Sequence, residues 1–263
     1  MKSYLAIFKI RAKMLFQYRA AAVAGIFTQL FWGVIQVMIF TAFYSEASGR
    51  EPMSLSQAIT FMWVGQALLG ILPWSIDKEI ESQIKSGHVA YELIRPIHLY
   101  NLWYVRSFAM RFIPTALRCL PIFILGGCLF GLTAPVSWGA GCVFSLSVIL
   151  ALFLSSALCT LVIISLFWTI SGEGIQRLLP HTTVLLSGMV VPLPLFPSWL
   201  QPFLSIQPLR GIMDIPCRLY TGMIPLSESL YYLGFQLGWT ILLIALGKVL
   251  IKKALKQFVV QGG

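Results

Sequence analysis

Charged residues are scarce in this chain. Only 11% of its 263 residues are Asp, Glu, Lys or Arg, whereas 58% are hydrophobic and the mean hydropathy is +0.83. A water-soluble domain of this length needs far more charge to cover its surface, so the composition indicates an integral membrane protein. Basic residues outnumber acidic ones by 19 to 9, but they gather at the ends of apolar runs and do not form a solvated basic face. We therefore expect no nucleic-acid partner.

The residue patterns that catalysis or metal binding requires are also missing. His88, His98 and His181 are scattered without metal-ligand spacing, and the five cysteines contain no CxxC pair. Gly247-Lys248 is followed by valine, so no GxxxxGK[ST] phosphate-binding loop occurs. These absences predict a protein that is not an enzyme and binds no cofactor or metal itself. Any ATP and Mg²⁺ would be used by a partner subunit.

Long apolar runs predict the fold class: an all-α polytopic membrane protein with six transmembrane helices. A bilayer core of about 30 Å needs roughly 20 apolar helical residues. Pro73 should kink the last turn of the second run, and the fifth run is shorter than a full crossing. The expected spans are about 20–44, 56–76, 107–132, 136–170, 178–191 and 230–250.

The distribution of Lys and Arg predicts the orientation of these spans. Six crossings place both termini on one side, and basic residues are concentrated at the termini and between spans two and three. The opposite side has only Arg50, Arg210 and Arg218. By the positive-inside rule, both termini are expected in the cytoplasm.

Residues 1–19 predict an amphipathic helix lying on the membrane surface. Lys2, Lys9 and Lys13 share one face, and apolar side chains such as Phe8 occupy the other. Arg11 interrupts the apolar face, and its long stem is expected to snorkel outward. The alternative is a simple basic flank that only sets topology.

The region between spans two and three, 77–106, contains the most polar long stretch of the chain, residues 86–103, and shows internal order. Ile76, Ile80 and Ile84 repeat every four residues among charged neighbours, which predicts an amphipathic helix that Gly87 ends. A second short turn, "VAYELI", should stop before Pro96. The pattern predicts a compact cytoplasmic element with a face for another protein.

The segment 192–228 holds half of the 14 prolines yet stays apolar. Short, proline-broken helices that dip into the outer leaflet account for both features, because irregular backbone at that depth must be covered by protein or line a cavity. We therefore expect an extracellular re-entrant segment between spans five and six.

A few polar residues inside the spans are candidates for a transport pathway. Gln29 and Gln36 share a face of span one, Gln66 lies in span two, and Arg118 lies seven residues after Arg111 in span three. An intramembrane charge indicates function by default. The alternatives are that the glutamines join helices and that Arg118 snorkels or binds backbone carbonyls.

Three stretches resemble the membrane subunits of ABC-2-type ABC transporters, specifically the bacterial six-span ABC-2 permease family. They are "LFQYRAA" before span one, "IKSGHVAYELIRPIHLY" after span two, and "LLSGMVVPLPLFPSWLQPFLSIQPLRGIMDIPCRLYTG" around span five. The resemblance covers essentially the whole chain, 1–263, as a single permease domain.

The resemblance implies a permease subunit that pairs with a second permease, identical or related, and is driven by a separate cytosolic ABC ATPase. It further implies an exporter of an amphiphilic or drug-like substrate in a bacterial plasma (inner) membrane, with membrane lipids as its surroundings. Residues 77–106 would be the coupling region seated on the ATPase, with Ile80, Ile84, Tyr91 and Leu93 as apolar anchors. The remaining coupling residues would be Glu79, Lys85, Gly87, Glu92, Arg95 and Pro96.

Two other classes stay open. One is an ion-coupled carrier or channel, although the lack of membrane-buried acids argues against proton coupling. The other is a membrane-embedded lipid-modifying enzyme, which would need a cluster of titratable groups near a bilayer face.

Overall fold

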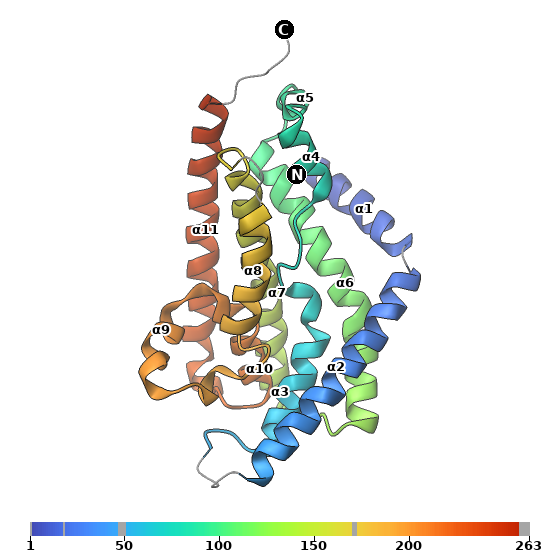
Figure 1. Cartoon of the computed structure of the whole chain (residues 1–263), viewed down its shortest axis with the longest axis vertical. Coiled ribbons are helices and arrows are strands. Elements are labelled where there is room, and N and C mark those ends of the chain that lie inside the picture. The colour runs from blue at the N-terminus through green and yellow to red at the C-terminus, as the bar shows by residue number, and fades with distance from the viewer. Residues whose placement is uncertain (1, 18, 47–50, 170–172, 258–263) are drawn as a thin grey trace.

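The computed structural model describes residues 2–17, 19–46, 51–169 and 173–257. Every regular element in these ranges is a helix, as the sequence predicted. The longer helices form an elongated bundle (Figure 1). They are α1 (Lys2–Gln17), α2 (Arg19–Ser45), α3 (Leu55–Ala67), α6 (Leu99–Leu129), α7 (Trp138–Ser165), α8 (Glu173–Leu186) and α11 (Ser229–Gln257). Two short helices, α4 (Lys78–Lys85) and α5 (Val89–Leu93), lie at the end of the bundle where α11 ends (Figure 1).

Four helices in the described ranges are long and apolar enough to cross a membrane. These segments are Ala22–Ser45, Leu99–Leu129, Trp138–Ser165 and Leu226–Lys256, the last of which includes the short turn before α11. The second and fifth expected spans correspond to the shorter helices α3 and α8, of 13 and 14 residues.

The second apolar run does not stay helical to Ile76. α3 ends at Ala67, a single 3-10 turn covers Leu69–Ile71, and the chain then runs without regular structure through Pro73 to Asp77. The expected kink at Pro73 is therefore a break, since proline offers no N–H to continue a helix. Side chains from other helices donate hydrogen bonds to backbone carbonyls of this stretch that have no partner within a helix.

Two such contacts cover the broken stretch. Ser155 of α7 donates to the Ile71 carbonyl, and Arg111 of α6 donates to the Ser75 carbonyl and contacts the Cys159 sulfur. A buried backbone without helical hydrogen bonds is stable only when its polar groups are paired in this way. Arg111 thus has a structural role that its position near the edge of span three did not reveal.

Helix α7 forms the centre of the bundle. It begins at an N-cap serine, Ser137, whose hydroxyl accepts from the Ala140 amide at 3.1 Å. It packs against α6, α10 and α11, and small residues such as Ala151 and Ala157 on it are fully buried. A helix that is apolar all round is expected to be surrounded by other helices.

The proline-rich segment 192–228 forms a series of short helices that project from one side of the bundle (Figure 1). Its α-helical parts are α9 (Gln201–Ile206) and α10 (Asp214–Tyr220). Helix α10 is anchored against α7, with Ile215 and Cys217 fully buried. Proline-broken short helices were predicted here, whereas insertion into the outer leaflet stays a prediction.

The N-terminal helix α1 packs along α6. Phe8 lies 6.2 Å from Phe108 and 5.9 Å from Phe112 between ring centroids. The predicted position of one residue was wrong: Arg11 does not snorkel outward but turns into the protein to pair with Glu79. The carboxylate attracts the guanidinium more effectively than water at the helix surface would.

Candidate functional site

The site begins with an N-cap. Asp77 precedes the amphipathic helix α4, and its carboxylate accepts from the amides of Glu79 at 3.0 Å and Ile80 at 3.4 Å. A carboxylate at this position also complements the positive end of the helix dipole. The side chain is nevertheless buried, so it needs a cationic partner as well.

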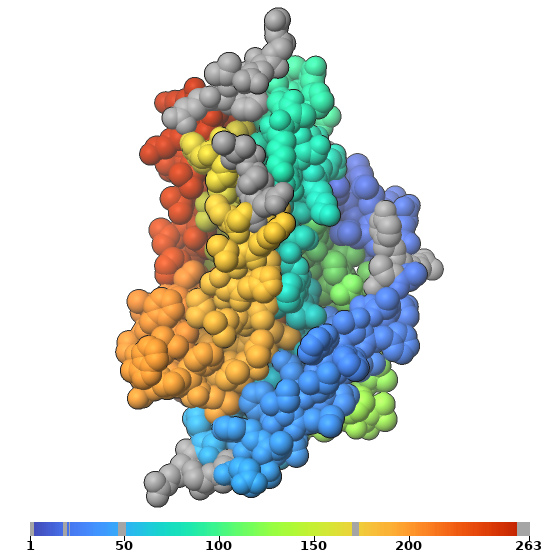
Figure 2. Space-filling model, viewed as in Figure 1, coloured from blue at the N-terminus to red at the C-terminus, as the bar shows by residue number. Residues whose placement is uncertain are grey.

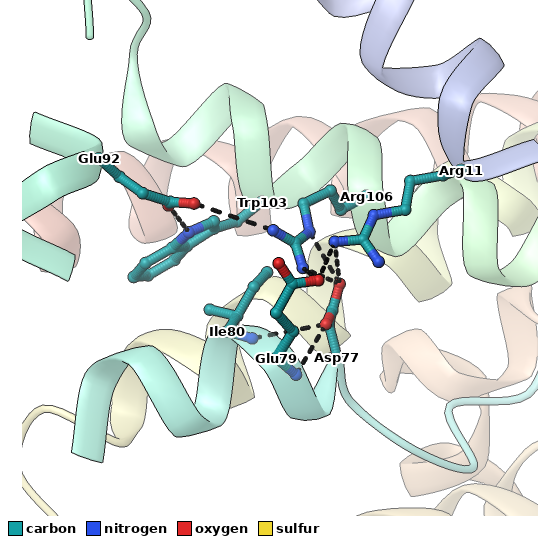
Figure 3. A network of polar contacts seen from close by, with 7 residues as sticks. All are labelled: Arg11, Asp77, Glu79, Ile80, Glu92, Trp103 and Arg106. Carbon is teal, nitrogen blue, oxygen red and sulfur yellow. Dashed lines mark hydrogen bonds and ion pairs between the residues drawn. The ribbon is translucent and has the colours of Figure 1, made fainter. Parts of the chain in front are cut away.

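Arg106 of α6 supplies that partner (Figure 3). Its Nε donates to Asp77 Oδ2 at 2.8 Å, and its Nη2 donates to Glu79 Oε2 at 2.8 Å. Its Nη1 lies 3.8 Å from Glu92 Oε1 on α5, and Trp103 Nε1 donates to the other oxygen of Glu92 at 3.2 Å. One buried guanidinium therefore joins α4, α5 and α6.

Arg11 extends this network to α1. Its guanidinium contacts Glu79 directly and lies 3.9 Å from Asp77 Oδ2 (Figure 3). Burial alone would raise the pKa of the Glu79 carboxyl, but the hydrogen bonds and positive charges of Arg11 and Arg106 outweigh it and hold the pKa below its ordinary value. Glu79 is thus ionised at neutral pH and connects α1 with α6.

Two of the four expected apolar anchors of the coupling region are not on its surface. Ile80 is fully buried and Ile84 is 7% exposed, in a cluster with Val89, Leu99 and Trp103 of the same chain. The prediction that these isoleucines face a partner was therefore wrong. The four-residue repeat does create an apolar face, but that face packs onto α6 because it is the nearest apolar surface.

The two expected acidic contacts also serve this chain. Glu92 is buried against Trp103 and Arg106, and Glu79 is held by two arginines although part of it is exposed. Lys85 remains exposed and pairs with Glu81 at 2.8 Å.

The outward face consists of the tip that follows α4. Gly87 has φ of +76°, a left-handed conformation that ends α4 as the sequence predicted. Beyond it Tyr91 is 68% and Ile94 is 80% exposed, and Leu93 is exposed as well. Arg95 and Pro96 complete the exposed surface. We call the residues Tyr91, Leu93, Ile94 and Pro96 the apolar tip, and Arg95 is the charged residue within it.

The structure brings together two of the candidate pathway residues. Gln66 of α3 donates to the Gln36 side chain of α2 at 2.8 Å, and Gln36 donates to the Met189 carbonyl at 3.3 Å. Gln29 is buried on α2 two helical turns before Gln36. Neither its side-chain nitrogen nor its side-chain oxygen has a hydrogen-bond partner in the described part of the chain. A polar line therefore runs along one face of α2.

Arg118 meets the same face of α2. A side-chain carbon at Gly25 would lie 2.4 Å from the centre of the Arg118 guanidinium, so the absence of a side chain there admits the arginine. Gly25 and Gln29 are four residues apart on α2, which places Arg118 next to the polar line.

Sequence reasoning missed the central roles of Asp77 and Arg106. An aspartate directly before an amphipathic helix is a recognisable N-cap signal. No local pattern, in contrast, links Arg106 to an acid 29 residues earlier. Among the described residues, no cluster of His, Cys, Asp or Glu could hold a metal ion.

Four helices long and apolar enough to cross a membrane indicate a multi-pass helical membrane protein. A model of a known family, described as ABC-2 family transporter protein, matches residues 30–262. The chain belongs to this family. It is a transporter membrane domain and not itself an enzyme. No curated protein matches the chain.

Proposed function

We propose that the chain is the permease subunit of an ABC-2 exporter in a bacterial inner membrane, with both termini in the cytoplasm. A separate cytosolic ABC ATPase hydrolyses ATP with Mg²⁺ and drives it, and a second permease, identical or related, completes the pathway. The four long helices together with α3 and α8 make the six crossings. The substrate is amphiphilic or drug-like.

The observation that carries this proposal is the contrast between the two sides of the α4–α5 element. Its inner side is fastened by the network of Asp77, Glu79, Glu92 and Arg106, whereas its outer side is the apolar tip. Large apolar side chains exposed at the polar end of a membrane protein indicate a protein partner. Figure 2 shows α4 and α5 at the extremity of the molecule, where a cytosolic subunit can reach them.

A hollow beside this tip gives the partner a place to insert. It has a volume of about 310 Å³ and is lined by residues of α1, α4, α5 and α6, including Arg11, His88, Tyr91 and Arg95. Interface energy concentrates in a few anchors that fill such pockets. The wall contains both charged and apolar side chains, so it suits a polar side chain of the partner that is flanked by apolar residues.

The same network can transmit movement. Because Arg106 holds α4 and α5 to α6, and Arg11 holds α4 to α1, a displacement of the tip moves these helices together. Energetic coupling between distant sites can be carried by rigid elements and charge networks that have two discrete arrangements. α6 also carries Arg118, which lies against α2, so the movement reaches the polar line of Gln36 and Gln66.

The decisive experiment measures association with the cytosolic ABC ATPase that co-purifies with the wild-type chain from its host. The double variant Tyr91→Ala, Ile94→Asp should weaken association by about a hundredfold or more, because each anchor contributes about 2 kcal/mol. The matched control is Lys85→Ala, which removes an exposed charge from the same element and should leave association nearly unchanged.

Both proteins are then reconstituted in vesicles, and substrate-stimulated ATP hydrolysis is measured. We expect the double variant to lose stimulation while the Lys85→Ala control keeps it. Wild-type association and stimulation in the double variant would show that the tip is not the coupling surface. Substrate movement by the chain alone under an ion gradient would instead support a carrier.

A further inference from the structure

A second charged cluster lies in the proline-rich segment, far along the chain from the coupling element. Arg210, Asp214 and Arg218 follow one another at four-residue intervals. The first lies in the 3-10 helix Pro208–Gly211 and the other two in α10, so that both arginines approach one carboxylate. Residues four apart on helical turns share a face.

This cluster is poorly saturated. Arg218 Nη1 donates to Asp214 Oδ2 at 3.4 Å, and Arg210 Nε lies 3.9 Å from the same oxygen. Charge-assisted hydrogen bonds are normally about 2.7 to 2.9 Å long. Arg210 also donates to the Ser205 carbonyl at 2.8 Å, but the Nε atoms of both arginines and Oδ1 of Asp214 have no hydrogen-bond partner within the described ranges.

The arginines border a hollow of about 420 Å³. Arg210 is only 7% exposed and is fixed against Tyr232 and Phe235, whose ring centroids lie 5.3 and 5.5 Å from its guanidinium carbon. Ser198 and Gln201 form a polar part of the wall. An almost fully buried arginine with an unpaired nitrogen thus lies in the wall of a polar hollow.

The charge balance of the hollow favours an anion. Two guanidinium groups face one carboxylate, which leaves a surplus of one positive charge in a largely buried place. An uncompensated buried charge is strongly unfavourable, whereas a singly charged anion would neutralise it. Guanidinium groups match the oxygens of a phosphate with paired, well-directed donors.

The surroundings favour an anion that carries hydrocarbon. Trp199, Phe203 and Ile206, from the turn Ser198–Leu200 and from α9, are large, apolar and exposed. They flank wall residues of the hollow in the sequence, and the segment projects from the side of the bundle (Figure 2). A head group in the hollow would therefore have apolar surface beside it.

We propose that this hollow binds the phosphodiester head group of an anionic amphiphile, with its hydrocarbon chains against the apolar side chains of α9 and the preceding turn. The volume exceeds that of a bare phosphate, and the hydroxyl and amide groups of Ser198 and Gln201 suit a hydroxyl-bearing substituent on the head group. The placement of this site in the outer half of the membrane rests on the proposed topology. The binding itself does not.

The test is titration calorimetry on the purified full chain in a neutral detergent. The probe is dihexanoyl-phosphatidylglycerol, compared with the zwitterionic dihexanoyl-phosphatidylcholine and with glycerophosphoglycerol, the same head group without chains. We expect phosphatidylglycerol to bind about tenfold or more tightly than either comparison, since the arginines read the charge and α9 reads the chains. Equal binding of phosphatidylcholine, or of the chain-free head group, would overturn the proposal.

Variants assign the binding to this hollow. Arg218→Gln should lower the affinity for phosphatidylglycerol by about tenfold, whereas Asp214→Asn should retain or raise it because a competing negative charge is removed. Lys252→Gln, which removes an exposed positive charge from the opposite end of α11, should change nothing. Unchanged affinity in Arg218→Gln would refute the site.

Elution profile and melting temperature show which variants fold, and the comparison of probes on the wild-type chain needs no variant at all. The assay contains neither ATPase nor nucleotide. A negative result would therefore leave the coupling proposal intact, and failure of ATPase association would leave this one intact.

Discussion

Two charged clusters of this protein use the same residue types but differ in how fully their hydrogen bonds and charges are paired. The inner network consists of Arg11, Asp77, Glu79, Glu92 and Arg106, and the outer cluster consists of Arg210, Asp214 and Arg218. In the inner network, Arg106 bonds to Asp77 and Glu79 at 2.8 Å, and acids outnumber arginines. In the outer cluster, two arginines share Asp214 at 3.4 and 3.9 Å. The comparison suggests that a saturated network holds helices together, whereas an undersaturated cluster beside a hollow keeps charge available for a ligand.

The largest expected effect comes from the centre of the inner network. Arg106→Gln leaves the buried carboxylate of Glu92 without its cation and Asp77 with only Arg11 at 3.9 Å, and breaking buried pairs in this way costs about 3 to 5 kcal/mol. The melting temperature of the purified protein should fall accordingly, and limited proteolysis should cut first between α4 and α6. A melting temperature equal to that of the wild type would show that the network does not hold the element.

A smaller effect is expected from the outer cluster. Arg218→Gln removes a long contact from a partly exposed arginine, and Asp214 keeps Arg210 nearby, so the loss should be about 1 to 2 kcal/mol. Thermal unfolding of Arg106→Gln and Arg218→Gln side by side measures the comparison directly. If the outer variant loses as much stability as the inner one, the outer cluster is structural and the contrast disappears.

A change at Gly87 tests whether the apolar tip needs its fixed position. Gly87→Ala meets no neighbouring atom, but the φ of +76° strains alanine, whose side-chain carbon disfavours the left-handed region, at a cost of about 1 kcal/mol. ATPase association should weaken modestly while the membrane bundle stays intact. Gly87→Asn is the matched control, because asparagine tolerates this conformation, and it should behave nearly like the wild type. Equal behaviour of alanine and asparagine would count against backbone strain.

The smallest expected effect is a response to acid at the junction of α1 and α4. A carboxyl whose pKa is lowered by folding contributes stability at pH values above its ordinary pKa of 4.5, and this contribution is lost as the pH falls through the lowered value. Spin labels at the exposed positions Lys9 and Lys85 should therefore show a distance distribution that widens as the pH is lowered stepwise from 7 to below 4.5. Glu79→Gln, which cannot ionise, should show no pH dependence from this contact, and an identical response in that variant would assign the change to another group.

The helical class of this protein is largely a property of its sequence. Apolar runs predicted the helix at 20–44, and the repeat of Ile76, Ile80 and Ile84 predicted an amphipathic helix that the structure places at Lys78–Lys85, because burial of apolar surface depends on a periodicity that is visible locally. The glycine stop at Gly87 was equally predictable, since few other residues adopt a positive φ. Proline density likewise predicted the short helices of 192–228.

Only the tertiary structure decided which side of each helix meets which neighbour. Ile80 and Ile84 were expected to face a partner, but α6 lies close enough to cover them, and the choice between these surfaces is not encoded in the helix period. Asp77 and Arg106 are 29 residues apart, and Arg210 and Asp214 meet at a distance too long for a saturated pair. Periodicity determines which face of a helix carries a residue. Packing between distant segments determines which partner that residue contacts and whether its charge is neutralised.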